Sequence, residues 1–206
     1  MEIEYKGANC VVISSKKVTI VVDPVLEALN GKTIAVKDAI QLATKASLAS
    51  DAVGRLRVDG PGEYEVANVS IKGIAARAHI EDKTTKNATM YSIDMEDIRI
   101  GITGHVAADV TEEQLEEMGT VDILILPVGG YGYTLEPHEA VALVRRIAPK
   151  VVAPTHFDDG KGAYQVAQGD LTPFLKELSA HHEIVARYKP KATALPEVLT
   201  VMQIER

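Results

Sequence analysis

Short apolar runs separated by Gly, Pro, Asn and Asp fill the first half of the chain. Many alternate between apolar and polar positions, which is typical of β-strands. The pattern predicts strands over residues 3–5, 10–14, 18–22, 55–58, 65–71, 88–93 and 98–103. Between residues 36 and 51 the spacing becomes Ala- and Leu-rich, and it predicts one helix there.

In the second half, strands alternate with helices that carry recognisable start signals. Thr111 and Gln114 have the spacing of a capping box and predict a helix over residues 112–118. Pro137 lies in the first turn of an amphipathic pattern that reaches Ile147, and Thr172 and Pro173 open a last helix that reaches residue 178. The remaining apolar runs predict strands over residues 121–127, 150–153, 183–188 and 198–204.

The order of these elements predicts the fold class. Many strands, then strand–helix units, then strands again indicate an α/β protein in which helices pack outside two central sheets. The Pro-, Ala- and Lys-containing stretch over residues 189–196 is too short to separate domains. We therefore expect residues 1–206 to form a single domain.

Composition and charge exclude several kinds of partner. The net charge is −7 and Lys and Arg form no run, which argues against a nucleic-acid groove. No apolar run approaches the roughly 20 residues that a membrane span requires. Cys10 is the only cysteine, so no disulfide can form within the chain. The alternating charges of residues 1–6 lead us to expect no secretion signal. We expect a cytoplasmic protein.

Histidines carry the candidate chemistry. His79, His105 and His156 lie just past the ends of predicted strands, where distant parts of an α/β chain meet. Three converging imidazoles would suit a tetrahedral metal ion with one open water position, although each alone could be an ordinary loop or core residue. By contrast, we expect His138 to face solvent, and His181 and His182 to end a helix.

Several blocks of sequence, in order across most of the chain, resemble metallo-β-lactamase-fold proteins of the L-ascorbate-6-phosphate lactonase-like branch. The blocks are Tyr5-Lys-Gly-Ala-Asn-Cys10, Asp23-Pro24, Asp59-Gly-Pro-Gly-Glu-Tyr64, Val69 to Gly73, Asn87, Ile-Thr-Gly-His105, Val121 to Gly130 and Pro154-Thr-His156. The resemblance implies a four-layer αββα sandwich with the active site along one edge of the sheets. Asp23-Pro24 would then shape the turn beneath the site.

The resembled family carries a H-x-H-x-D-H motif that supplies ligands to two zinc ions. The matching stretch has Lys45 and Ser47 at the first two histidine positions, and Ala49 and Ser50 at the aspartate and third histidine. A methyl group cannot bind zinc, a serine hydroxyl rarely does, and lysine is protonated near neutral pH. The resemblance therefore implies a degenerate site in which the binuclear centre cannot assemble.

The other family positions keep ligand-type residues. His79 and His156 match later histidines of the family, and His105 stands where the bridging aspartate would be. Two readings stay open: one zinc or other divalent transition metal held by His79, His105 and His156, or a metal-free histidine pocket. Glu63 is expected to support the site or to be structural. Asp158 and Asp159 either orient His156 or solvate a loop.

Two functions from different classes follow. The first is a metal-dependent hydrolase of an ester, lactone or phosphoester; the second is a non-catalytic descendant that binds a ligand or serves in assembly. In either case we expect a small-molecule ligand or substrate. An RNA-processing role is disfavoured because the chain is acidic and short. A homo-oligomer is compatible with the sequence.

Overall fold

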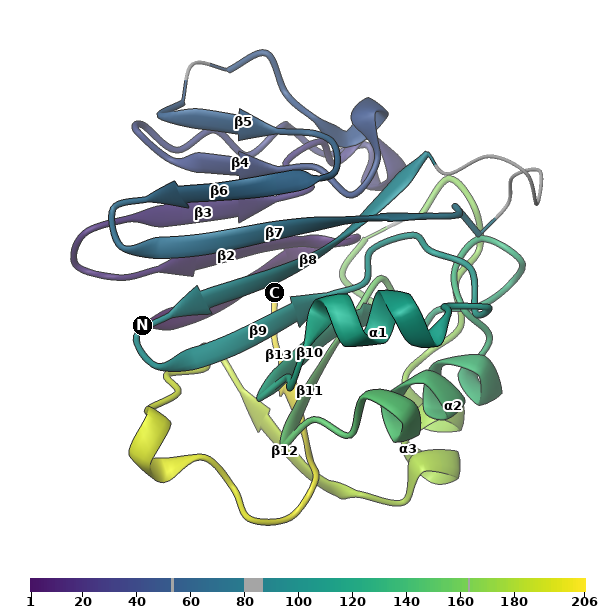
Figure 1. Cartoon of the computed structure of the whole chain (residues 1–206). Helices are drawn as coiled ribbons and strands as arrows, with labels where there is room; N and C mark the ends of the chain where they lie inside the picture. The colour runs from purple at the N-terminus through teal and green to yellow at the C-terminus, as the bar shows by residue number, and fades with distance from the viewer. Residues whose placement is uncertain (53, 80–86, 163) are drawn as a thin grey trace.

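Two β-sheets pack face to face, and three α-helices lie against the larger sheet (Figure 1). The computed structural model describes residues 1–52, 54–79, 87–162 and 164–206. The smaller sheet has the order β1-β2-β3-β4-β5. Its strands are β1 (Glu2–Gly7), β2 (Cys10–Ser14), β3 (Thr19–Val22), β4 (Ile40–Leu42) and β5 (Leu56–Val58).

The larger sheet has the order β12-β13-β11-β10-β9-β8-β7-β6. Its strands are β6 (Gly62–Val66), β7 (Val69–Ala76), β8 (Ala88–Met95), β9 (Ile98–Ile102), β10 (Ile123–Pro127), β11 (Val151–Thr155), β12 (His181–Val185) and β13 (Thr200–Ile204). The α-helices are α1 (Glu112–Met118), α2 (Pro137–Ile147) and α3 (Thr172–Leu178), and the 3-10 helices are η1 (Glu27–Leu29), η2 (Ala46–Leu48) and η3 (Ala192–Ala194). None of the described helices is long and apolar enough to cross a membrane.

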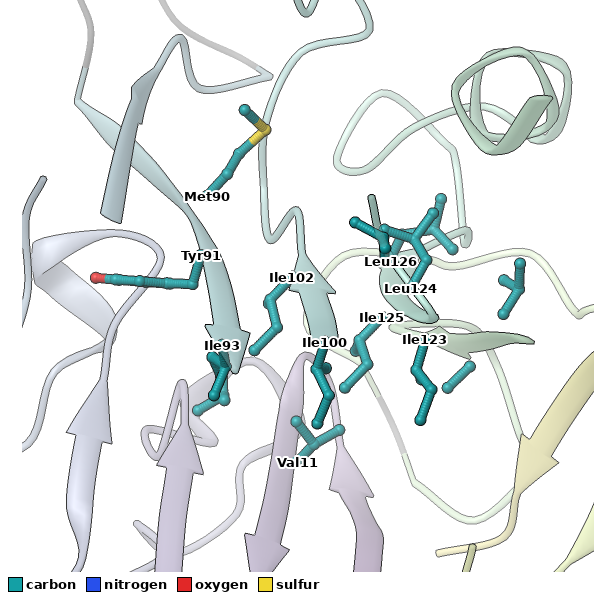
Figure 2. Close-up of a cluster of buried hydrophobic side chains, with 14 of the residues drawn as sticks. Val11, Met90, Tyr91, Ile93, Ile100, Ile102, Ile123, Leu124, Ile125 and Leu126 are labelled. Atoms are coloured by element: carbon teal, nitrogen blue, oxygen red, sulfur yellow. The ribbon is translucent and has the colours of Figure 1, made fainter. Parts of the chain in front are cut away.

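Alternation along the strands builds one core between the sheets. On β2, Val11 and Ile13 join the main buried cluster, whereas Val12 belongs to a second cluster on the outer face of the smaller sheet. Figure 2 shows Val11 together with residues of the larger sheet such as Ile93 and Ile100. A continuous core of this kind supports the single-domain α/β prediction, which is confirmed.

The helix signals of the second half are confirmed. The Thr111 hydroxyl accepts a hydrogen bond from the backbone N–H of Gln114, and the Gln114 side chain accepts one from the N–H of Thr111. Helix α2 begins at Pro137 and ends at Ile147, as its periodicity predicts. Local capping chemistry decides these boundaries, so they are readable from the sequence.

The predicted helix over residues 36–51 is wrong. Ile40 and Leu42 are instead buried in β4, which lies between β3 and β5 in a parallel arrangement, and only the short helix η2 follows. Among the described residues no α-helix covers the outer face of the smaller sheet. Apolar side chains of the connecting segments cover it, including Leu26, Ile34 and Val36. Non-local strand pairing overrides the Ala- and Leu-rich composition here.

Two further boundaries differ from the prediction. The expected strand over residues 65–71 is a hairpin, because Ala67 and Asn68 both adopt positive φ and reverse the chain between β6 and β7. His181 and His182 do not end a helix; they begin β12, whose five residues pair with β13. Because of its parallel pairing with β13, the strand begins at His181 and not at residue 183 as predicted, although His181 and His182 are polar.

The Tyr91 hydroxyl links the two sheets and provides a test of their packing. Tyr91 of β8 is fully buried, and its hydroxyl donates to the carbonyl of Ala43 at 2.8 Å, with the Val58 carbonyl at 3.2 Å. We expect Tyr91→Phe to lower the free energy of unfolding by about 1–2 kcal/mol, because buried carbonyls lose a donor. Urea denaturation measures the change. Tyr131→Phe, at an exposed position, should leave stability unchanged, and equal stabilities of both variants would contradict the prediction.

Candidate functional site

Four buried polar residues join the two sheets at one edge. The Asp23 carboxylate accepts hydrogen bonds from the Asn9 amide (2.6 Å) and from the Thr44 backbone and hydroxyl (both 2.7 Å). The Thr155 hydroxyl at the end of β11 donates to the Asn9 carbonyl oxygen at 2.7 Å. We call these four residues the Asp23 network. It places Lys45 and His156, the next residues along the chain, at the same edge.

His156 is held by both its backbone and its ring. It has a φ of 51°, and its backbone N–H points at the Ala8 carbonyl (2.7 Å) and the Tyr5 hydroxyl (3.2 Å). Its Nδ1 lies 3.2 Å from Oε1 of Gln168. The Gln168 amide nitrogen donates to the carbonyls of Val166 and Ala167, so the Gln168 oxygen faces the histidine as an acceptor.

This arrangement determines which ring nitrogen of His156 carries the proton. Because Gln168 offers an acceptor, Nδ1 donates and Nε2 keeps its lone pair. Nε2 is buried and has no hydrogen-bond partner among the residues that the structure describes. Burying a hydrogen-bond acceptor without a partner costs free energy, so the buried Nε2 of His156 points to a ligand bound beside it.

His105 lies beside His156. The two ring centres are 4.9 Å apart with an angle of 82° between the ring planes. Two imidazoles on one tetrahedral ion, each about 2.1 Å from it, have ring centres roughly 5 Å apart. Gly104, with a φ of 61°, allows the close approach that brings His105 here, since a Cβ atom would lie 2.3 Å from Thr44 Cβ.

His79 reaches the same place from the end of β7. Its backbone N–H donates to the carbonyl of His105 at 2.9 Å, and its buried Nδ1 has no hydrogen-bond partner in the described part of the chain. His79 and His105 line a cavity of about 70 Å³ together with Lys45 and Tyr133. Nevertheless, no three His, Cys, Asp or Glu side chains of the described residues lie close enough to form a metal-binding group.

Burial keeps the central histidines neutral. It lowers the pKa of His156 to about 4, although the Gln168 hydrogen bond acts in the opposite direction. Burial also holds the pKa of His105 well below its usual value, assisted by unfavourable electrostatic interactions of a charged His105 ring with His156, Lys45 and His79. Neutral imidazoles at physiological pH can accept a hydrogen bond or bind a metal ion without first losing a proton.

The expected supporting carboxylates lie elsewhere. Glu63 is exposed on β6, where its carboxylate is 3.6 Å from the Lys72 ammonium. Asp158 accepts from the backbone of Gly160, and Asp159 pairs with Arg206 at 2.8 Å. The structure brings none of the three to a histidine ring by a hydrogen bond. Gln168 orients His156 instead, and no spacing or motif distinguishes this loop glutamine in the sequence.

A second cavity adjoins the first. It has a volume of about 220 Å³, and it shares Ser47, Leu48 and Tyr133 with the smaller cavity. His156 and Tyr164 face each other in its wall with ring centres 5.0 Å apart. The site therefore has a small polar compartment at His105 and a larger, partly aromatic one at His156.

The fold is a two-sheet α/β sandwich whose candidate site lies at one edge of the sheets. Proteins named as hydrolases share this class of fold. Residues 2–156 match the family model described as a beta-lactamase superfamily domain, and the chain belongs to this family. A UPF0173 metal-dependent hydrolase of Thermococcus onnurineus is 31% identical over 100 residues, which are 47% of this chain and 44% of the relative. The chain thus matches less than half of that relative's length.

Solved structures agree on the fold. A putative Zn-dependent hydrolase of the metallo-beta-lactamase superfamily from Thermotoga maritima superposes with a TM-score of 0.75 at 24% identity, covering 99% of this chain and 100% of that one. Igni18, a metallo hydrolase from Ignicoccus hospitalis, gives a TM-score of 0.61 at 15% identity, covering 100% and 96%. The metallo-β-lactamase fold class inferred from the sequence is confirmed.

Replacing Asp23 should change how stability depends on pH. Burial raises the Asp23 pKa from 3.8 to about 6. Between these two pH values the folded state binds more protons than the unfolded state, so the free energy of unfolding falls as the pH rises. We expect this contribution to decrease by about 1 kcal/mol from pH 5 to pH 7 and to be absent in Asp23→Asn. Urea denaturation at both pH values measures it, with exposed Asp51→Asn as control. Parallel pH profiles of wild type and Asp23→Asn would contradict it.

Replacing Gln168 should change the tautomer of His156. In Gln168→Leu the Nδ1 proton loses its acceptor, so we expect neutral His156 to shift from Nδ1–H toward Nε2–H, at a stability cost of about 1–2 kcal/mol. Nitrogen-15 chemical shifts of the imidazole at pH 7 report the tautomer. Gln165→Leu is the matched control, because Gln165 bonds to the Glu27 carbonyl and Asn30 and not to His156. An unchanged His156 spectrum in Gln168→Leu would show that Gln168 does not select the tautomer.

Proposed function

We propose that this chain is a metal-dependent hydrolase with a single-ion site in place of the family's binuclear centre. His105 and His156 are two of its ligands and His79 is the third. The observation that carries the proposal is the buried, unpartnered Nε2 of His156, which Gln168 keeps unprotonated beside the His105 ring. The names of the relatives, which describe metal-dependent hydrolases, support the same class of activity.

The chemistry of the donor set suits one ion and not two, although the described side chains would have to move closer together to share it. Lys45 and Ser47 line the small cavity where the first two histidines of the family motif would stand, and a protonated amine cannot ligate a cation. The remaining nitrogen donors are imidazoles, and both His79 and His156 have a buried ring nitrogen without a partner. Zinc is the ion that this chemistry favours.

A divalent ion supplies Lewis acidity that lowers the pKa of water toward neutrality and polarises a carbonyl or phosphoryl oxygen. The chain's own residues keep His105 and His156 neutral by burial and hold the His156 ring in one orientation through Gln168. Lys45 adds positive charge beside the small cavity, which favours an electron-rich oxygen of an ester, lactone or phosphoester substrate. We place this activity on a small molecule in the cytoplasm.

A metal-free ligand-binding protein is the second candidate. It is favoured by the absence, within the described part of the chain, of three ligand-type side chains close enough to share an ion. In that case the unpartnered nitrogens of His79 and His156 accept hydrogen bonds from a ligand, and Lys45 supplies charge where the family holds a metal ion. The two candidates differ in one measurable property, the affinity for a divalent metal.

Metal titration separates the candidates. We expect tag-free protein to bind one equivalent of Zn²⁺ or Co²⁺ in isothermal titration, with affinity reduced at least about 100-fold in His105→Ala and in His156→Ala because each loses a ligand. His138→Ala removes an exposed histidine of α2 and should bind as wild type does. Undetectable binding, or equal affinity in all four proteins, would refute the single-ion hydrolase and support the metal-free candidate.

A further inference from the structure

The larger cavity differs from the small one in the charge and the polarity of the side chains that line it. Its described lining residues include one carboxylate, Glu27, and no Lys or Arg. Val25, Leu48, Tyr133, Tyr164 and Val166 supply apolar and aromatic surface. The described residues that line the small cavity include Lys45 and no carboxylate. The two compartments therefore suit chemically different parts of one ligand.

The volumes of the compartments separate those parts further. At about 70 Å³ the small compartment is less than half the size of the 220 Å³ one, so it suits the smaller, polar part of a ligand. An apolar cavity of about 150 Å³ accommodates benzene, so the 220 Å³ compartment can hold a substituted six-membered ring. Tyr133 and Tyr164 line this compartment and offer aromatic surface against which such a ring can pack.

Charge discriminates between the substrate classes that the proposed function leaves open. A phosphate group carries charge that needs Arg, Lys or clustered N–H donors when it is taken out of water. The larger compartment offers the Glu27 carboxylate and apolar and aromatic side chains instead, and no Lys or Arg among its described lining residues. A phosphorylated organic group, which the lactonase-like resemblance would imply, is therefore poorly matched to this cavity.

We propose that the substrate is an ester or lactone whose uncharged, ring-sized organic group occupies the compartment lined by Tyr133, Tyr164 and Val166. This inference rests on the proposed function for the reacting group, which lies at His105 in the small compartment. Recognition of the organic group itself needs no metal ion, because Tyr133, Tyr164 and Val166 contribute ring and methyl surface. Its test can therefore be made separately from metal binding.

The test compares two probes with the same ring, phenyl acetate and phenyl phosphate, by NMR titration of the full chain in EDTA, which suppresses metal-dependent turnover. We expect saturable binding of phenyl acetate at least tenfold tighter than that of phenyl phosphate. Tyr164→Ala should weaken phenyl acetate binding at least fivefold, whereas Tyr164→Phe keeps the ring and should stay within twofold. Tyr131→Ala, at an exposed position that does not line the cavity, is the control and should bind as wild type does.

A charge substitution tests the same inference without removing an aromatic ring. The Val166 side chain lines the cavity and is 45% exposed, so a lysine can extend there with little effect on folding. We expect Val166→Lys to bind phenyl phosphate at least fivefold more tightly than wild type does. Equal or tighter binding of phenyl phosphate by wild type, no saturation with phenyl acetate, or an unchanged phosphate affinity in Val166→Lys would each overturn the inference. Failure of metal binding alone would refute the single-ion hydrolase and leave the cavity's ligand preference intact.

Discussion

The buried carboxylate of Asp23 is the constraint on which the site depends. It accepts three hydrogen bonds from Asn9 and Thr44, and Thr155 extends the network from the smaller sheet to the larger one. Leaving any of these donors unpaired in the interior would cost free energy, so the strand ends are held at one edge. Lys45 and His156 follow directly in the chain. The network therefore sets the backbone position from which both side chains start, and contacts with Ala8, Tyr5 and Gln168 then fix His156.

The fold around this network is that of the family, whereas the donors proposed for the site differ from the family motif. The chain belongs to the beta-lactamase superfamily domain family, and its fold superposes on solved members over nearly the whole chain. Lys45 and Ser47 nevertheless line the small cavity beside His79 and His105. The proposed single-ion site therefore relies on the histidines of this edge.

Much of the fold is readable from local signals. The Thr111–Gln114 capping box and the Pro137 helix start are set by residues close in sequence, and both appear where they are predicted. The helix predicted over residues 36–51 is wrong because Ile40 and Leu42 form a strand only when β3 and β5 pair with it on either side. The role of Gln168 is hidden for the same reason. Its partner His156 is twelve residues away across an irregular loop, and the contact has no sequence period.

The sequence by itself determined the class of fold, the family resemblance and the candidate donors, because each depends on residue type and order along the chain. Only the tertiary structure decided that His105 and His156 lie 4.9 Å apart, that Glu63 points to Lys72, and that Gln168 orients the His156 ring. Such contacts depend on how distant strand ends and loops pack together. Hydrophobic periodicity specifies which face of a strand is buried, but it carries no information on which polar side chains meet at its end.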